Sequence, residues 1–370
     1  MKPHYLTLVG IFTLFFSTYT LADNFNQTYQ AYLDSEKTTD HQQTLELAIE
    51  SLALGKAKYG ESDANTINLT FNLATSYAAA KKFQNAFNTM EVVTTDYATR
   101  YSEYSENYFS ALLEQLSYYP RGGASNLTKS KRVISPKAKQ AIDIANYLSE
   151  QSAEKAPFYY YQLSRIISRS PMVHFVRRQA IKYTELAYQG LLESVGKSDS
   201  RTLESQFLLA TIKTGTGKTN SAIALYEDLI KSIKAQLDTS HPYELAARSR
   251  LIELYEKNGE SENATEHCIE IGRMKPWEQD LDPTPLYRLE PRYPVDYARR
   301  SKEGWAKLSF SIDEMGFVKD IEIIDTKGGT DFGHQSAKVL EKWRYAPKFE
   351  GGQAVTAKGV TVQMDFKMAR

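Results

Sequence analysis

The chain repeats one spacing of residues three times without a gap, and this repetition constrains its fold more than any other feature. Each copy starts at a polar residue, has an apolar pair ten residues later and an alanine 23 residues after its start. The copies start at Asp63, Asp199 and His241 and reach their alanines at Ala86, Ala222 and Ala264. The last two copies lie 42 residues apart, and such fixed spacing is typical of a stacked helical repeat.

These copies resemble tetratricopeptide repeats of a slightly lengthened kind. The resemblance implies a pair of helices in each copy, with the small alanine letting the second helix approach the first. It also places Gly259 in the turn of the last copy.

Helix signals continue between the first and second copies, although the spacing there is irregular. The predicted helices cover residues 138–148, 158–167 and 172–195, and a proline precedes each of them. Residues 120–135 contain two adjacent glycines and four basic residues, and are predicted to form a long loop. Together with the regular copies, this predicts about five helical pairs within a domain over residues 23–275.

A helical array of this kind implies no catalytic activity, but it presents a surface on which a partner can bind. Stacked helix pairs leave one long face that the core does not need, and repeat proteins bind peptides or proteins there. Candidate contacts are the tyrosines of the helical stretches, namely Tyr101, Tyr104, Tyr108, Tyr159, Tyr160 and Tyr161. Tyrosine serves equally well in helix packing and in binding grooves, so both roles stay open for these side chains.

Residues 215–219, Gly-Thr-Gly-Lys-Thr, look like a phosphate-binding loop but lack its context. The complete pattern needs a glycine where Ile212 stands, and a strand where the repeat predicts a helix. We therefore predict that this segment is a turn between two repeat helices. The sequence also lacks a nucleophile elbow, a His-Glu-x-x-His motif and a distinct carboxylate pair, so we expect neither an enzyme nor a cofactor.

Charge and cysteine content exclude further classes of function. The chain has 45 Lys and Arg against 45 Asp and Glu, without the basic clustering that nucleic-acid binding needs. The single cysteine, Cys268, excludes an intrachain disulfide and a multi-cysteine metal site. Its neighbour His267 would point about 100° away on a helix, so Cys268 is predicted to be buried in repeat packing.

Residues 1–22 have the pattern of a cleaved secretory signal. Lys2 precedes an almost wholly apolar run over residues 5–21, and small residues occupy the positions that signal peptidase recognises before Asp23. We predict cleavage between Ala22 and Asp23. The alternative is an uncleaved anchor, because a run of about 17 residues is at the lower limit for a spanning helix.

Three prolines within residues 275–285 exclude a helix there and predict a short linker, assigned to residues 276–286. Its shortness predicts limited freedom between the helical array and a carboxyl-terminal domain over residues 287–370.

Alternating hydrophobicity predicts three strands in this carboxyl-terminal domain. The first covers residues 305–312, with Ala306, Leu308, Phe310 and Ile312 on one side. After a turn at residues 313–316, the second strand buries Val318, Ile321 and Ile323, and a slip in phase predicts a bulge at Lys319-Asp320. The last covers residues 359–368, with Val360, Val362, Met364, Phe366 and Met368 on one side.

One helix is predicted between the second and the last strand. Asp331 is its expected cap, and Ala337, Leu340 and Trp343 recur at helical spacing until Pro347 forbids continuation. A small sheet covered by one helix leaves at least one strand edge open, and such an edge accepts an extended peptide.

These features resemble, in order and spacing, the carboxyl-terminal domain of the TonB family, over about 80 of the 370 residues. The motifs are Tyr293-Pro294, Glu303-Gly304, Asp313 with Gly316, Trp343-Arg344-Tyr345 with Pro347, and the final strand. The resemblance implies an antiparallel three-stranded sheet with a covering helix. It also implies that the domain, in the periplasm, pairs one strand with the amino-terminal segment of an outer-membrane transporter.

Position by position, the resemblance implies three groups of partner-binding residues. They are the segment Glu290, Pro291, Arg292, Tyr293 and Pro294; the aromatic residues Phe332, Trp343, Tyr345 and Phe366; and the pairing strand Gly359, Val360, Thr361, Val362, Gln363, Met364 and Phe366. Trp343 and Phe366 fit core positions better than contact positions, and Tyr293-Pro294 fits an extended approach to the sheet. The strand is therefore favoured over any single side chain.

Three hypotheses follow. In the first, the chain is a periplasmic adaptor whose array binds an unknown envelope protein while its terminal domain pairs with a transporter. In the second, residues 5–21 stay in the inner membrane and the chain is an energy transducer coupled to a proton-driven motor complex. In the third, the terminal domain is structural and the array does all the binding.

Overall fold

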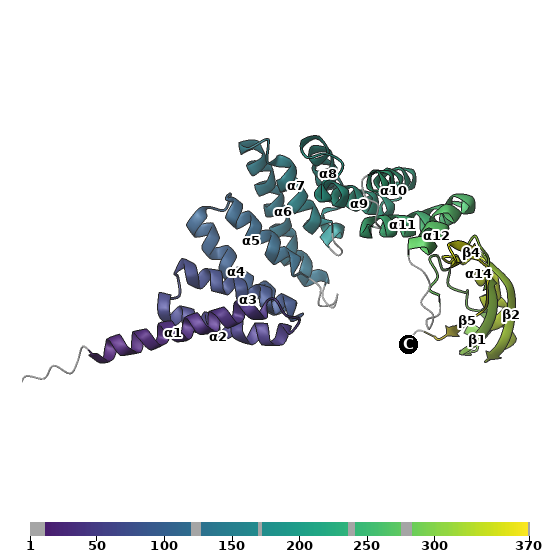
Figure 1. The fold of residues 1–370 in the computed structure, drawn as a ribbon, viewed down its shortest axis with the longest axis horizontal. Helices are drawn as coiled ribbons and strands as arrows, with labels where there is room; N and C mark the ends of the chain where they lie inside the picture. Colours follow the sequence, from purple (N-terminus) through teal and green to yellow (C-terminus); the bar gives the residue numbers. More distant parts are fainter. Residues whose placement is uncertain (1–11, 120–126, 169–171, 236–240, 275–282, 369–370) are drawn as a thin grey trace, which may run out of the picture. The chain divides into compact units, whose positions relative to one another are not determined.

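The structure, a computed structural model, describes residues 12–119, 127–168, 172–235, 241–274 and 283–368 (Figure 1). It falls into two units, Met1–Ser194 and Val195–Arg370. Residues 1–11, which include half of the predicted signal, lie outside the described residues, whereas Ala22 and Asp23 lie within the first described helix. In the part of the chain that is described, we find no helix with the length and apolarity needed to cross a membrane.

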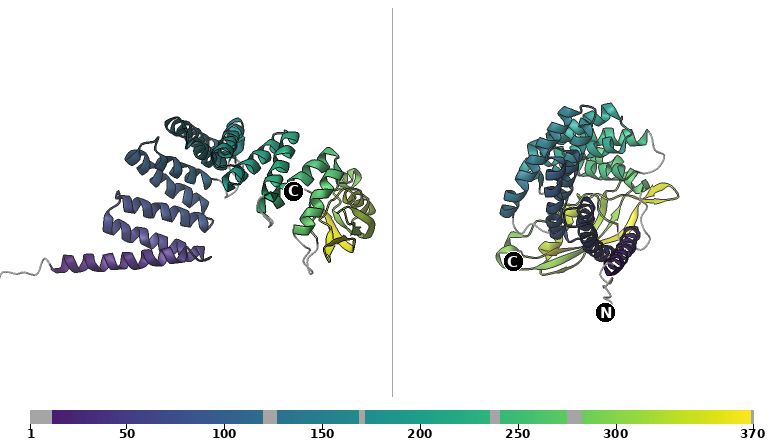
Figure 2. Two further views of the ribbon diagram at one scale, coloured as in Figure 1. Left: turned by 45° about the horizontal axis from the view of Figure 1, so that its top comes forward. Right: turned by 90° about the vertical axis from the view of Figure 1, so that its left-hand side faces the viewer.

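The first unit consists of helices that stack in chain order (Figures 1 and 2). Its helices are α1 (Phe12–Ser35), α2 (His41–Tyr59), α3 (Ala64–Ala79), α4 (Phe83–Tyr101), α5 (Glu106–Ser117), α6 (Leu127–Gln151), α7 (Ala156–Ile167) and α8 (Met172–Ser194). The second unit continues with α9 (Ser200–Gly215), α10 (Thr219–Lys234), α11 (Pro242–Asn258) and α12 (Ser261–Met274). Among the described helices these form six consecutive pairs, where the sequence predicted about five.

The polar residue that starts each sequence copy is a helix N-cap. The carboxylates of Asp63 and Asp199 accept hydrogen bonds from backbone N–H groups two residues on, at 2.8 and 2.9 Å. His241 does the same through Nδ1, at 3.1 Å. A cap satisfies an N–H that has no partner inside the helix, which explains why a polar side chain recurs at this position.

The alanine of each copy is a core residue at the start of the second helix of its pair. All three alanines are 0% exposed and lie in the first turns of α4, α10 and α12: Ala86, Ala222 and Ala264. A larger side chain there would push the paired helices apart. The structure thus confirms the helical pairs and the role that the resemblance assigned to these residues.

The turns between the paired helices share one backbone geometry. Lys81, Gly217 and Gly259 each lie 18 residues after the cap and have φ values of 59°, 75° and 77°. In each turn the next N–H donates to the carbonyl five residues back, at 2.8 to 2.9 Å. Residues 215–219 therefore form an inter-helix turn, as predicted, and not a phosphate-binding loop.

The loop predicted over residues 120–135 is wrong in its second half. Residues 127–135 belong to α6, whose interior contains Pro136, while residues 120–126 lie outside the described part. A proline inside a helix costs about 3 kcal/mol. Ile134, Ala138 and Ala141 are 0% exposed at helical spacing on both sides of Pro136, and this buried stripe holds the helix together across it.

The terminal domain contains a three-stranded antiparallel sheet in the order β2-β1-β5 (Figure 1). Its elements are α13 (Val295–Arg299), β1 (Gly304–Ile312), β2 (Val318–Lys327), α14 (Thr330–Leu340), β3 (Lys348–Glu350), β4 (Gln353–Val355) and β5 (Ala357–Phe366). The inward residues predicted for β1 are all buried, at 2% exposure or less. The hairpin of β3 and β4 was not predicted.

Several details of this domain differ from the sequence prediction. The helix α14 is capped at Gly329, so Asp331 lies in its first turn. It ends at Leu340, and Trp343 lies beyond it. Met368 lies beyond β5 and is 38% exposed. Ile323 contacts α14 at Gly333 as an inward residue would, but is 40% exposed because β2 is an edge strand.

The shared turn geometry predicts opposite effects for two matched substitutions. A side chain held at positive φ costs about 1 kcal/mol that glycine avoids. We expect Lys81→Gly to raise the free energy of unfolding by about that amount, and Gly217→Lys to lower it similarly. Urea unfolding followed by far-UV circular dichroism measures both. A destabilised Lys81→Gly variant would contradict this account of the turn.

Candidate functional site

The sheet has two edges, because β1 pairs with β2 on one side and β5 on the other. An edge strand directs alternate backbone N–H and C=O groups away from its neighbour. Each edge is therefore a candidate surface for an extended peptide.

The β2 edge carries features that oppose pairing. Its register to β1 shifts twice, between Lys307 and Leu308 and between Ser309 and Ser311, and the second shift confirms the predicted bulge. Asp320 within this bulge has a φ of 53°. Bulges twist an edge and charged side chains disfavour a partner strand, and both protect sheets from unwanted pairing. Exposed charges on β2 are Lys319, Asp320, Glu322, Asp325 and Lys327.

The β5 edge is regular over seven residues. From Val360 to Phe366 each residue faces the next residue of β1 without a shift. The one irregularity lies before this stretch, at Gly359, where φ is 72°. Among the described residues, β1 is the only strand that pairs with β5. This edge therefore offers a straight row of backbone groups.

The two faces of β5 differ in character. Thr361, Gln363 and Asp365 point to the outer face and are exposed. On the inner face, Met364 and Phe366 are buried, whereas Val360 and Val362 are half-buried because α14 packs on β1 and β2. A strand added beside β5 would cover the two valines with its inward side chains.

Two of the predicted aromatic residues form the core beneath the β5 end of the sheet. Phe332 is 0% exposed and Phe366 is 3% exposed, and their rings stack at 4.4 Å between centroids. Tyr293 meets both rings edge-on at 5.7 Å, and its hydroxyl donates to the carbonyl of Lys302 at 2.7 Å. Tyr293 therefore ties the segment before the sheet to this core.

The other two aromatic residues, Trp343 and Tyr345, are each 2% exposed. Trp343 donates from its indole nitrogen to the carbonyl of Leu289 at 2.9 Å, and so holds the start of the Glu290–Pro294 segment. All four predicted aromatic residues thus have packing roles in this structure. Direct contact between them and a partner stays a prediction.

The predicted segment Glu290–Pro294 is extended and differs in exposure along its length. Glu290 and Arg292 are exposed, and Glu290 pairs with the guanidinium of Arg288. Pro291 is half-buried, while Pro294 is buried and occupies the N-cap position of α13. Only the charged side chains of the segment are therefore free to reach a partner.

The role of Arg344, which is 1% exposed, was not predicted from the sequence. Its neighbours Trp343 and Tyr345 were singled out, whereas the arginine was only part of the motif. No sequence signal marks the contact, because its partner Glu256 lies 88 residues away in the helical array.

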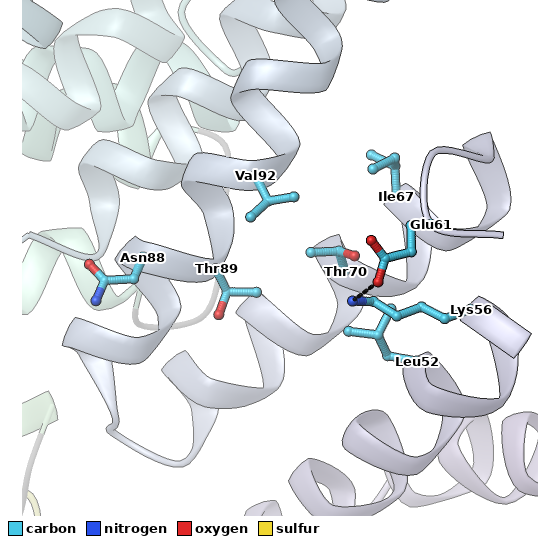
Figure 3. Close-up of a pocket in the computed structure, with 8 residues that line it drawn as sticks. All are labelled: Leu52, Lys56, Glu61, Ile67, Thr70, Asn88, Thr89 and Val92. Carbon is cyan, nitrogen blue, oxygen red and sulfur yellow. Dashed lines mark hydrogen bonds and ion pairs between the residues drawn. The ribbon is translucent and has the colours of Figure 1, made fainter.

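A second candidate surface lies in the first unit, between α2, α3 and α4. Figure 3 shows a pocket of about 380 Å³, with an ion pair between Lys56 and Glu61 (3.4 Å) at its rim and Val92, 53% exposed, on the opposite wall. It is lined by Leu52, Lys56, Glu61, Ile67, Thr70, Asn88, Thr89 and Val92. The lining mixes polar, charged and apolar side chains, which suits a side chain of a protein partner better than a small molecule.

The tyrosines of the array differ in exposure, and a binding role for the exposed ones stays a prediction. Tyr108 and Tyr159 are each 6% exposed and pack in the core of the first unit. Tyr101 and Tyr104 are 44% and 48% exposed, and the ring of Tyr104 lies 4.9 Å from the exposed ring of Tyr147, with the two planes tilted by 59°. Tyr160 and Tyr161 are half-buried. Within the described ranges, no cluster of His, Cys, Asp and Glu is arranged to hold a metal ion.

Comparison with known proteins places the terminal domain in a recognised group. Residues 290–368 match the family described as the Gram-negative bacterial TonB protein C-terminal. A protein TonB of Pseudomonas aeruginosa is 31% identical over 91 residues, which are 25% of this chain and 26% of that protein. The chain thus spans about a quarter of this curated relative. TonB family proteins are interaction proteins and not enzymes, as expected from the sequence.

Two solved structures are similar to separate parts of the chain. A solution structure of the Pseudomonas aeruginosa TonB CTD is 29% identical, covers 25% of this chain and 92% of that one, and gives a TM-score of 0.22. A tetratricopeptide repeat protein from Parabacteroides merdae is 14% identical, covers 68% and 80%, and gives a TM-score of 0.45.

The anchoring role of Tyr293 predicts a measurable loss of stability. We expect Tyr293→Phe to lower the free energy of unfolding of the terminal domain by about 1 kcal/mol, because the Lys302 carbonyl loses its donor. Tyr297→Phe is the matched control, since its ring packs on Phe332 at 4.9 Å in the same cluster. Hydrogen exchange of the β1 and β5 amides measures both. Equal effects would contradict the anchoring role.

Proposed function

We propose that this chain, which carries a TonB-type carboxyl-terminal domain behind a tetratricopeptide-like helical array, binds outer-membrane transporters by pairing an extended transporter segment with β5. One observation carries the proposal: β5 combines a regular, unpaired edge with membership in the matched domain. The transporter segment contributes backbone hydrogen bonds along residues 360–366, and its alternate side chains cover Val360 and Val362.

Exposed charges on the terminal domain contribute to the choice of partner. Glu290 and Arg292 lie on the extended segment held by Trp343, and Asp365 lies on the outer face of β5. Charges at the rim of an interface change association rates and select partners more than they add affinity. The four buried aromatic residues support the edge from below and are not contacts in this proposal.

The helical array serves as a scaffold for a second envelope protein in this proposal. The pocket between α2 and α4 and the exposed rings of Tyr101, Tyr104 and Tyr147 support a protein-binding face in the first unit. The chain then acts as an adaptor in TonB-dependent transport. The domain limits proposed are a signal over residues 1–22, the array over 23–275, a linker over 276–286 and the terminal domain over 287–370.

Pairing along β5 is tested by two adjacent proline substitutions, Val362→Pro and Gln363→Pro. Adjacent residues direct their N–H groups to opposite sides of a strand, so one variant loses a bond to β1 and the other a bond to the partner. We expect the variant that loses only its bond to the partner to keep the stability of the sheet. The same variant should bind a transporter amino-terminal peptide at least about tenfold more weakly. Fluorescence anisotropy measures the binding.

Glu322→Pro on the β2 edge is the matched control for these variants. It places the same substitution on the other edge of the sheet, and we expect it to leave peptide affinity unchanged. Wild-type affinity in both β5 variants would refute pairing at β5, and a loss of affinity in Glu322→Pro would move the site to β2.

The proposed location is the periplasm, after removal of residues 1–22. Amino-terminal sequencing of the protein from periplasmic and membrane fractions tests it. We expect a soluble periplasmic chain that begins at Asp23. A chain that retains residues 5–21 in the inner membrane would instead support an energy transducer coupled to a proton-driven motor complex.

A further inference from the structure

The side chain of Arg344 leaves the terminal domain and enters the last helical pair, where it is 1% exposed. Its guanidinium forms an ion pair with Glu256 of α11, whose side chain is 9% exposed. It also donates to the carbonyl of Ser261 at 3.2 Å and to the hydroxyl of Thr265 at 2.9 Å, both on α12. A fourth bond, of 3.0 Å, returns to the carbonyl of Met315 in the β1–β2 turn.

The backbone of Arg344 is fixed on both sides. Its N–H donates to the carbonyl of Tyr287 at 3.0 Å, and its own carbonyl accepts from the N–H of Leu286 at 2.7 Å. The guanidinium lies 3.7 Å from the ring centroid of Phe317, a distance that gives a strong cation–π contact at a buried site. Arg344 therefore joins the β1–β2 turn, the segment that leads to Glu290, and the helical pair.

Close packing surrounds this arginine. Cys268 is 0% exposed on α12, in a cluster with Leu286 at the end of the linker and with Tyr287 and Ala346 of the terminal domain. A Cβ atom added at Gly272 of α12 would lie 2.8 Å from the carbonyl oxygen of Pro347. The backbones of α12 and the terminal domain are thus packed directly against each other. Two surfaces joined only by an exposed ion pair would not be packed this closely.

We propose that Arg344 is an interdomain clamp, which makes α11, α12 and the terminal domain one rigid body. A guanidinium has five donors and cannot lose its charge, so withdrawing Glu256 leaves a buried cation unpaired. The clamp therefore opens only together with loss of the Arg344–Glu256 pair. The residue is part of the Trp343-Arg344-Tyr345 motif, and in this chain it acts as a positioning residue and not as a partner contact.

Hydrogen bonds through the β1–β2 turn connect the clamp to β5, the strand proposed to pair with the partner. The N–H of Tyr345 donates to the carbonyl of Gly316 at 3.0 Å, which fixes the β1–β2 turn. In the same turn, the carboxylate of Glu314 accepts from the hydroxyl of Thr356 at 2.6 Å, one residue before β5. A pull on a strand paired with β5 is therefore passed to the helical array through the clamp. This last step, unlike the clamp itself, rests on the proposed function.

Cys268 provides a native probe of the clamp, because it is the single cysteine of the chain. Burial raises the pKa of its thiol to about 12, and the terminal domain covers part of it. The thiolate is the reactive form, so an alkylating reagent reacts at neutral pH only with molecules whose clamp has opened. We expect slow labelling of the native full-length chain. Labelling at the rate of the urea-unfolded chain would overturn the proposal.

Two substitutions separate the clamp from an ordinary surface pair. Glu256→Gln keeps the shape but removes the charge that neutralises Arg344, and we expect labelling of Cys268 to become about a hundredfold faster. Arg288→Met is the matched control, because Arg288 also pairs with a glutamate and lies 5.5 Å from the ring of Trp343, but is exposed. It should leave the rate unchanged. Equal rates in both variants would overturn the proposal.

A double variant keeps the test valid if a single substitution disturbs folding. We expect Glu256→Met with Arg344→Met to label more slowly than Glu256→Gln, because an apolar pair leaves no buried charge. Circular dichroism confirms that the helices of each variant remain folded. If the rate increase of the double variant equals the product of the increases in Glu256→Met and Arg344→Met measured singly, the two residues are not coupled and the clamp is refuted.

A cleavage experiment tests whether the body holds together without the covalent linker. A protease site introduced within residues 275–282 of the full-length chain is cut, and the products are separated by size-exclusion chromatography. We expect the two pieces to elute together, and to separate in the Glu256→Gln background. Separation of the wild-type pieces would overturn the clamp. Neither experiment uses a transporter peptide, so failure to bind one counts against the proposed function alone.

Discussion

Every backbone N–H and C=O group in a folded protein needs a hydrogen-bond partner, and this constraint explains most of the terminal domain. With β1 at the centre of the sheet, two rows of backbone groups face outward. The two rows differ, because β2 is bulged and charged, whereas β5 pairs with β1 without a register shift from Val360 to Phe366. The contrast between a regular edge and a protected one is the reason that we propose β5 as the side at which another strand pairs.

The same constraint shapes the helical array. N–H groups in the first turns of α3, α9 and α11 are capped by Asp63, Asp199 and His241, and each cap occupies the same position within its sequence copy. The alanine of each pair allows the helices to approach, and the left-handed residue between them reverses the chain. Regular spacing in the sequence thus reflects three separate physical requirements, each met at a fixed place in every copy.

Local patterns in the sequence predicted those parts of the fold that depend on neighbouring residues. The alternation in β1, the bulge at Asp320 and the turn at Gly217 each follow from a few consecutive side chains. The prediction was wrong where distant contacts decide: α6 continues through Pro136 because Ile134 and Ala138 are buried against other helices. The role of Arg344 was missed for the same reason, because no residue near it in the sequence indicates a contact with Glu256. At the candidate site, the motif predicted the strand but could not separate packed aromatic rings from exposed ones.

The identical turns of the array have a consequence for its size. Each regular copy starts at a capped helix and has the same backbone geometry at the turn between its two helices, so the copies that start at Asp199 and His241, 42 residues apart, are built alike. An ancestor could have lengthened or shortened the array by whole copies, without altering the sheet at the far end of the chain. The distance between the two ends of such a molecule is then set by gene duplication, in steps of one helical hairpin.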